Sequence, residues 1–208
     1  YTLGEHEAIG FIFPVHGWRT PRLVRQFIDQ LSIDAGGKSH YAYLILTAGD
    51  SIGRTVERLL PHLRAKGIDP QLFASIIMPE SYVGLPFMDV DTPAKEQKKK
   101  DEAASQLDAL VETIARWDCR RRDDSFRSLT LITDKPFHVV ADRCIKCGRC
   151  ASVCPVGDIE GGKGRQPQWL HHDDCLTCFS CYHHCPTHAI EFGGRTKHKG
   201  QYFYTRRK

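Results

Sequence analysis

The chain of 208 residues carries a formal net charge of +4 at pH 7, with 41% hydrophobic and 26% charged residues. This length allows one or two domains with a sizeable core, and so mild a positive charge does not indicate a nucleic-acid binder. The longest apolar runs, "AIGFIFPV" and "YAYLILTA", have the length of β-strands, so neither a membrane span nor a signal peptide is predicted.

Residues 8–78 alternate between strand and helix patterns. The two apolar runs and "LFASIIM" predict three strands, and "AIGFIFPV" is apolar throughout, as a strand buried on both faces should be. A βαβαβ order predicts a parallel sheet with right-handed crossovers. Ligands of such sheets bind at the loops that follow the strands, which here are "PVHGWRTP" and "TAGDSIG".

Two amphipathic helices are expected between these strands. The first begins at Thr20-Pro21, an N-cap followed by a first-turn proline. The second runs from about Ile52 to a stop at Gly67, and Pro61 should kink or shorten it. The expected inner faces are Leu23, Phe27, Ile28 and Leu31 in the first helix and Val56, Leu59, Leu60 and Leu63 in the second.

Residues 93–118 predict one long helix that connects two parts of the chain. Its first half is charged, and its lysine run is either a solvated face or a docking patch. Its second half carries an apolar stripe of Leu107, Leu110, Val111, Ile114 and Trp117. Residues 119–136 are the predicted linker, in which Cys119 is expected to be a bystander thiol.

Two rows of four cysteines follow, "CIKCGRCASVCP" at 144–155 and "CLTCFSCYHHCP" at 175–186, at an offset of 31 residues. The same offset relates Asp142 to Asp173, Pro155 to Pro186 and Ile159-Glu160 to Ile190-Glu191. A fixed offset over some twenty positions indicates a duplicated supersecondary unit. Each unit is expected to be a strand, a cysteine-rich loop, a helical turn and a second strand, and Gly161, Gly162 and Gly164 between the units suit a turn with positive φ.

Three interpretations compete for these cysteines. A disulfide framework is typical of small secreted chains, whereas here eight of the nine cysteines lie in the last third of the chain. Structural zinc needs four ligands, usually from a pair of C-x-x-C motifs, and two rows of four fit that pattern poorly. The iron–sulfur motif C-x-x-C-x-x-C-x-x-x-C-P occurs twice without deviation.

In this motif the first three thiolates of a row bind one 4Fe–4S cluster and the fourth binds the other cluster. The sequence therefore predicts two sites with crossed ligands. The first site comprises Cys144, Cys147, Cys150 and Cys185. The second site comprises Cys175, Cys178, Cys181 and Cys154.

Residues 137–194 thus resemble a two-cluster, bacterial-type ferredoxin, which implies a βαββαβ fold and one-electron transfer. Five histidines of the second repeat, His171, His172, His183, His184 and His188, form either a polar rim or groups whose protonation tunes the cluster potential. The basic tail, residues 195–208, is expected to cover this module and to leave positive charge for an acidic partner.

The N-terminal part resembles the second half of a flavodoxin domain. Trp18, three residues before the helix-opening Pro21, resembles the aromatic residue that stacks on a flavin, although His16 stands where that family commonly carries another aromatic residue. "TAGDSIG" resembles the loop around the flavin edge. The phosphate loop of that family would follow an earlier strand, and no such loop precedes Ala8. The resemblance implies FMN sites at Pro14, His16, Gly17, Trp18, Thr47, Ala48, Gly49, Asp50 and Gly53. The alternatives are a core tryptophan and a structural turn.

The whole chain resembles a bacterial and archaeal family of fused flavodoxin–ferredoxin proteins. The expected organisation is an α/β parallel-sheet part (1–92), the long helix (93–118), the linker (119–136), the α+β ferredoxin domain (137–194) and the tail (195–208). The expected function is electron transfer between a flavin site, two 4Fe–4S clusters and a redox partner protein in the cytoplasm. The alternative is an oxidoreductase that acts on its own small-molecule substrate. No membrane or nucleic-acid partner is expected.

Overall fold

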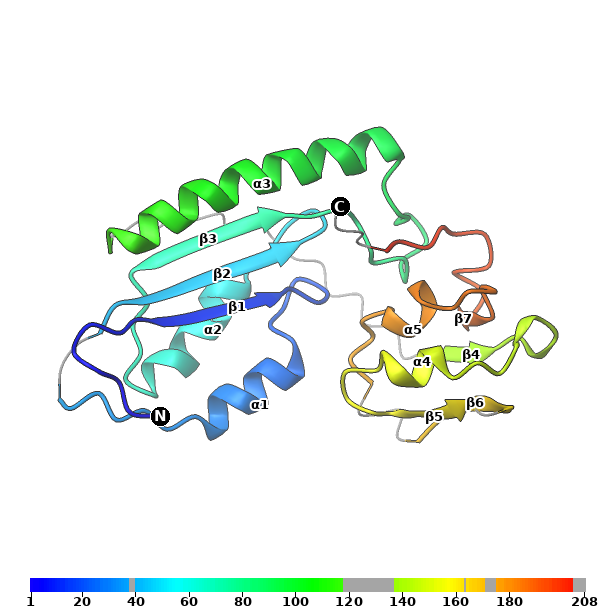
Figure 1. Ribbon diagram of the computed structural model, residues 1–208, viewed down its shortest axis with the longest axis horizontal. Helices are drawn as coiled ribbons and strands as arrows, with labels where there is room; N and C mark the ends of the chain where they lie inside the picture. The colour runs from blue at the N-terminus through cyan, green and yellow to red at the C-terminus, as the bar shows by residue number, and fades with distance from the viewer. Residues whose placement is uncertain (38–39, 118–136, 163, 171–174, 204–208) are drawn as a thin grey trace. The chain divides into compact units, whose positions relative to one another are not determined.

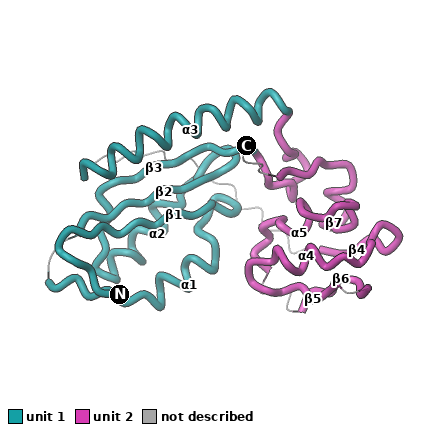
Figure 2. The backbone as a smooth tube through the Cα atoms, in the orientation of Figure 1, with its two compact units in different colours: residues 1–79, 93–131 teal, residues 80–92, 132–208 magenta. Residues whose placement is uncertain are grey.

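The computed structural model describes residues 1–37, 40–117, 137–162, 164–170 and 175–203 (Figure 1). The predicted linker with Cys119, and His171 and His172, lie outside these residues. The chain divides into two compact units (Figure 2), unit 1 with residues 1–79 and 93–131 and unit 2 with residues 80–92 and 132–208. No helix among the described residues combines the length and apolarity that a membrane crossing requires.

Unit 1 is a parallel α/β sheet, as the sequence predicts. Its strands are β1 (Ile9–Pro14), β2 (Ala42–Ala48) and β3 (Leu72–Ile77), in the order β1-β2-β3. Its helices are α1 (Arg22–Gln30), α2 (Thr55–Arg64) and α3 (Pro93–Ala115). All strand pairs are parallel, with Ile9 opposite Ala42 and Tyr43 opposite Leu72, so the carboxyl ends of β1 and β2 lie at one edge.

The sheet of unit 1 lies between two layers of helices (Figure 1). On one face, α1 and α2 cover a core that includes Leu44, Leu46, Leu59 and Leu63. On the other face, α3 packs over β2 and β3 through a second core of Ile45, Ile76 and Ala103, with partly buried hydrophobic residues around it.

Two of the predicted apolar faces were wrong in part. Strand β1 is buried on one face only, since Ile12 is 63% exposed while Phe11 and Phe13 are buried. The core under α3 draws its strand residues from β2 and β3 and does not include Ile12. In α1, Leu23 and Phe27 are also exposed, and the residues that face the core are Val24, Ile28 and Leu31.

The two remaining helices of unit 1 match the prediction only in part, since α2 begins at Thr55 and not at Ile52. Pro61 lies inside α2, which continues to Arg64, and Gly67 follows it with a φ of 75°. In α3, Leu110 and Ile114 pack against the sheet, whereas Leu107 and Val111 of the expected stripe are exposed. The helix covers the sheet along a narrower face than its apolar pattern suggested.

Unit 2 contains a small α+β region with the predicted βαββαβ order. Its elements are β4 (Phe137–Val139), the 3₁₀ turn η1 (Ala141–Arg143), α4 (Arg149–Ser152), β5 (Ile159–Gly162), β6 (Arg165–Trp169), α5 (Ser180–His183) and β7 (Ile190–Phe192). Strands β4 and β7 pair antiparallel, and β5 and β6 form an antiparallel hairpin.

The sequence repeat is also a backbone repeat. Left-handed residues recur at the offset of 31, and the two short helices α4 and α5 begin at equivalent positions. The equivalent left-handed pairs are Lys146 and Thr177, Gly148 and Phe179, Gly157 and His188, and Gly162 and Gly193. An L-residue with a side chain rarely adopts this conformation, so its recurrence at paired positions means that both loops fold in the same way.

Residues 80–92 belong to unit 2, although the sequence predicts that the N-terminal α/β part extends to residue 92. Val83 and Leu85 are buried, with 0% and 2% exposure. Gly84 lies against the ring of Phe179, because a Cβ there would be 2.8 Å from Phe179 Cζ. His183 Nε2 also lies 2.6 Å from Ser81 O. The segment follows β3 in sequence, but its apolar side chains complete the core of unit 2.

Candidate metal centres

The four thiols predicted for the first site line one hollow of unit 2, which we call the first hollow. Cys144, Cys147 and Cys150 reach it from the loop before α4 and from α4 itself, and Cys185 reaches it from the end of the second repeat. Pro167 of β6 and Ile190 of β7 also line it. Three thiols of one row and the last thiol of the other row therefore face one space.

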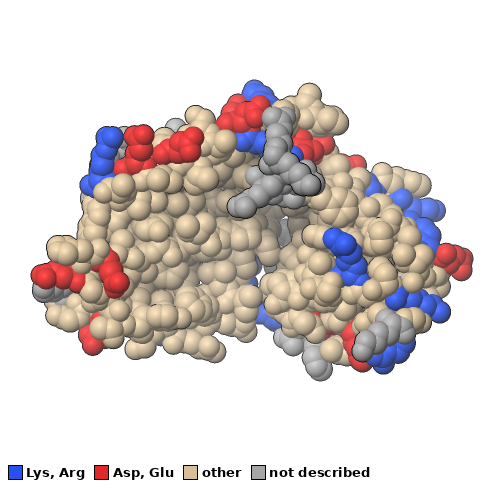
Figure 3. Space-filling view, viewed as in Figure 1, with Lys and Arg blue, Asp and Glu red and all other residues tan. Residues whose placement is uncertain are grey.

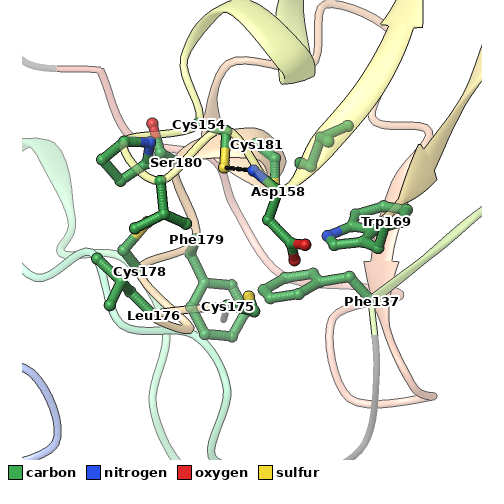
Figure 4. Close-up of a pocket in the computed structure, with 13 residues that line it drawn as sticks. Phe137, Cys154, Asp158, Trp169, Cys175, Leu176, Cys178, Phe179, Ser180 and Cys181 are labelled. Carbon is green, nitrogen blue, oxygen red and sulfur yellow. Dashed lines mark hydrogen bonds between the residues drawn. The ribbon is translucent and has the colours of Figure 1, made fainter. Parts of the chain in front are cut away.

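The second hollow is the counterpart of the first. Cys175, Cys178 and Cys181 line it together with Cys154 (Figure 4), and the apolar side chains around them include Phe137, Ile159, Trp169 and Phe179. The empty volumes of the two hollows, counted with the space open to solvent, are about 320 and 310 Å³. Spaces of nearly equal size, each with four thiols, fit two copies of the same occupant.

The thiols are spread around each hollow instead of meeting at one point. Among the described residues, no three His, Cys, Asp or Glu side chains are placed to hold a single metal ion. A 4Fe–4S cluster binds its four thiolates at four separate iron atoms. The spread of the thiols therefore fits a cluster.

Backbone amides donate hydrogen bonds to the cysteine sulfurs at equivalent positions of the two repeats. Asp158 N donates to Cys154 Sγ over 3.3 Å, and Ala189 N donates to Cys185 Sγ over 3.1 Å. Thr177 N makes a third such contact, at 3.5 Å from Cys175 Sγ. Hydrogen bonds of this kind stabilise negative charge on sulfur and are among the features that set the reduction potential of a cluster.

The protein alone disfavours thiolates at several of these positions. Burial raises the pKa values of Cys150, Cys175, Cys178 and Cys181, and the charge of neighbouring thiols raises them further. Iron supplies the positive charge that stabilises closely spaced thiolates. The donor set thus matches a cationic cluster core better than free thiols.

The eight thiols of the two hollows differ in their exposure to solvent. Cys147 is exposed, whereas Cys150, Cys181 and Cys185 are buried and the other four thiols are half-buried. Ile145, next to Cys144, is 63% exposed, and Lys146 is exposed as well. The loop of residues 145–147 therefore presents the first hollow at the surface.

Sequence reasoning missed Asp158 at the second hollow and the buried position of His183. Asp158 lines it and is only 3% exposed. The offset of 31 offered a signal, because it pairs Asp158 with Ala189 in otherwise similar stretches. His183 was expected at a polar rim or as a titrating group, but it is 4% exposed, and its ring nitrogens contact Ser81 O and Tyr202 N.

The residues proposed for a flavin lie in two loops that touch. Pro14 ends β1, and Gly17 and Trp18 form a left-handed turn closed by hydrogen bonds between His16 and Arg19. Gly53 has a φ of 53°, and a Cβ there would lie 2.8 Å from Trp18 Cβ. The contact joins the loop after β1 to the loop after β2.

The other candidate residues of the second loop have mainly structural roles in the described contacts. Thr47 and Ala48 are the last residues of β2, and their carbonyls accept hydrogen bonds from Val15 N and Met78 N. Gly49 O accepts a hydrogen bond from Lys99 Nζ at 2.6 Å, and Asp50 Oδ1 accepts one from Ser51 N.

One polar atom in the first of these loops is buried without a partner. His16 Nδ1 makes no hydrogen bond within the described residues. Burial lowers the pKa of this imidazole.

Comparison with known proteins identifies residues 138–186 as a 4Fe-4S dicluster domain. The ferredoxin of Megasphaera elsdenii is 62% identical over 26 residues, which are 12% of this chain and 48% of that protein. The ferredoxin of Thermoanaerobacterium thermosaccharolyticum is 50% identical over 28 residues, 14% of this chain and 51% of that protein. The chain spans about half the length of these relatives, and no solved structure matches it.

Proposed function

We propose that this chain is an electron-transfer protein that passes electrons between a flavin site in unit 1, the two 4Fe–4S clusters of its ferredoxin-type domain and a redox partner. The observation that carries the proposal is the pair of hollows of nearly equal size, each lined by four thiols and receiving an amide–sulfur hydrogen bond at an equivalent position. Clusters of this type transfer single electrons, and no protein group is needed for bond making.

The ligand sets are proposed as crossed between the two rows. Support comes from the linings of the hollows, since Cys154 lines the hollow of the second row and Cys185 lines the hollow of the first row. The anaerobically reconstituted protein should contain about eight iron and eight sulfide ions per chain. About one zinc ion and no sulfide would contradict the iron–sulfur assignment.

A pair of substitutions tests the crossed ligands. Cys154→Ser should damage the cluster of Cys175, Cys178 and Cys181, because a hydroxyl competes poorly with a thiol for iron. Cys185→Ser should damage the other cluster. Cys147→Ser and Cys178→Ser provide the reference spectra in paramagnetic resonance of the reduced proteins. If the Cys154→Ser spectrum matches that of Cys147→Ser, each row binds its own cluster.

The flavin part of the proposal rests on the two loops at the carboxyl ends of β1 and β2. Trp18 offers an aromatic ring beside Gly53, and the buried His16 Nδ1 has no partner within the described residues. When bound, FMN would exchange electrons in steps of one or two. Trp18 and His16 would hold its ring, and Thr47, Gly49 and Asp50 would lie at its edge.

FMN binding is measured by quenching of flavin fluorescence. Trp18→Ala should abolish the quenching, and Trp169→Ala, in the ferredoxin-type domain, should preserve it. Equal FMN binding by wild type and Trp18→Ala would refute this site.

The electron-accepting partner is proposed to be an acidic protein. Lys146 and Arg149 are exposed beside Cys147, and Lys and Arg side chains lie at several places on the surface of unit 2 (Figure 3). An acidic carrier would therefore be steered to the loop of residues 145–147. The rate of its reduction should fall with increasing salt, and Lys146→Glu should slow it. A rate that salt leaves unchanged would contradict this interaction.

Dye reduction separates the carrier from the alternative oxidoreductase. A carrier should reduce dyes and proteins when it is supplied with electrons, in proportion to its cluster content. An enzyme acting at a flavin should instead show a rate that depends on a specific small-molecule substrate.

A further inference from the structure

The two repeats place different side chains at one equivalent position beside the clusters. Asp158 and Ala189 both stand four residues after the last cysteine of their row. Each donates its backbone N–H to that cysteine's sulfur, at 3.3 Å and 3.1 Å. The backbone is therefore the same at the two positions, and only the side chain differs, a carboxylate in one repeat and a methyl group in the other.

The Asp158 side chain lies inside the protein at the second hollow. It is 3% exposed and lines the hollow together with Cys154, Cys175, Cys178 and Cys181. Figure 4 shows its carboxylate turned toward the rings of Phe137 and Trp169.

The fold does not require a carboxylate at this position. Ala189 makes the same amide–sulfur bond and is itself buried, with 1% exposure. A charge taken out of water costs free energy unless other interactions compensate for it. The first repeat carries a methyl group at the equivalent position, so the shared backbone forms without a carboxylate there.

On the basis of the proposed function, we infer that the Asp158 carboxylate holds the reduction potential of the second site below that of the first site. The effect is electrostatic. An added electron makes a cluster more negative, so a fixed negative charge nearby opposes reduction. At an effective dielectric constant of about 20, a unit charge within about 10 Å changes such an equilibrium by about tenfold or more.

Positive charges near the first site would also favour a higher reduction potential at the first site than at the second. Lys146 and Arg149 are exposed in the first repeat, and the equivalent residues of the second repeat are the uncharged Thr177 and Ser180. Arg143, beside Cys144, donates to Glu191 Oε1 over 2.6 Å, so this ion pair adds little net charge. Exposed cations have a smaller effect than a buried carboxylate because solvent screens them.

The difference in potential gives the electron a preferred position. A single electron delivered to the second site would move to the first site, which gains that electron as the second site loses it. The first site lies behind the exposed Cys147 and Ile145. Asp158 would thus direct electrons toward the surface where a partner can collect them.

The test uses exchange of the two equivalent side chains in the full, cluster-loaded protein. Asp158→Asn and Asp158→Ala remove the charge, and Ala189→Asp introduces one at the first site. Reduction potentials are measured by titration with dithionite, followed by paramagnetic resonance. Both Asp158 variants should raise the potential of the second site by about 59 mV, which corresponds to a tenfold change in the ratio of reduced to oxidised cluster, and leave the first site within a third of that shift.

Ala189→Asp should lower the potential of the first site in the same assay. Unchanged potentials in Asp158→Asn and Asp158→Ala, or an equal shift at both sites, would overturn the inference. Iron and sulfide contents near eight in wild type and variants keep this outcome separate from failure of the proposed function, in which no cluster would form. If Ala189→Asp fails to fold, the two Asp158 variants still decide the matter.

Discussion

Lys199 holds residues 80–92 against the rest of unit 2 through hydrogen bonds, and its replacement should increase the local opening of this segment. The Lys199 ammonium donates hydrogen bonds to the carbonyls of Val83, Leu85 and Met88, at 2.9 Å for the first and 2.5 Å for the last. Burial lowers the pKa of Lys199. Lys199→Met keeps much of the aliphatic chain and removes all three donors, so the carbonyls lose their partner.

The size of the effect follows from these contacts. A hydrogen bond to a charged group contributes about 1.5–3 kcal/mol, but the three bonds share one ammonium group and are not additive. We therefore expect a loss of about 3 kcal/mol in the free energy of local opening. Since about 1.4 kcal/mol equals a factor of ten, amides of this segment should exchange about 100-fold faster.

Native-state hydrogen exchange, measured by mass spectrometry on the peptide of residues 80–92, reports this opening. Suitable reporters are Tyr82 N, which donates to Glu80 Oε1, and Met88 N, which donates to Leu85 O. Lys197→Met is the matched control because Lys197 is exposed. Exchange in Lys199→Met within threefold of this control, with iron content unchanged, would refute the reasoning.

Two further predictions follow from backbone geometry and burial. Gly148→Ala should lower the iron content of the first site, because its Cβ would lie 2.7 Å from Gly162 Cα. Gly164→Ala is the control, since Gly164 also has a positive φ but a Cβ there would have no atom within 4 Å. Equal iron loss in both variants would show that backbone strain alone, and not the clash, is responsible. Burial lowers the pKa of His16 below 6.5, so its contribution to stability is fully present above pH 6.5 and is lost as pH falls toward the folded-state pKa. Denaturant unfolding of unit 1 should therefore show a smaller loss of stability below pH 6.5 in His16→Phe than in wild type, and parallel pH profiles would contradict this.

The candidate metal site was largely predictable from the sequence, because its information is local. Cysteine spacing fixes which thiols share a loop, and the offset of 31 carries the backbone conformation from one repeat to the other. The order of strands and helices in unit 1 was predictable for the same reason, since apolar periodicity reports each element separately. Gly67 as the end of α2 is a further example.

Contacts between segments distant in the sequence were not predictable in this way. Periodicity marks an apolar face but does not say what covers it, so Ile12, Leu23 and Phe27 were expected inside and are exposed. Residues 80–92 have no helix or strand period, and only the core of unit 2 shows where they belong. His183 looked like a surface residue because its partners, Ser81 and Tyr202, come from other parts of the chain.

The two repeats differ in the side chains that they carry at equivalent backbone positions. At equivalent left-handed positions, Gly148 allows the backbone of Gly162 to approach, whereas Phe179 places a ring, 1% exposed, at the centre of the unit 2 core. That ring contacts Tyr82 at a centroid distance of 5.2 Å and Phe137 at 5.0 Å.

The second repeat thus serves as the attachment point for residues 80–92 and for the C-terminal segment, whose Gln201 Nε2 donates to Tyr182 O at 2.5 Å. Phe179 and Tyr182 of this repeat are buried, and the loop of residues 145–147 in the first repeat is exposed. If Asp158 lowers the potential of the second site as we propose, an electron would pass from that site to the first, where the exposed Cys147 lies beside Lys146.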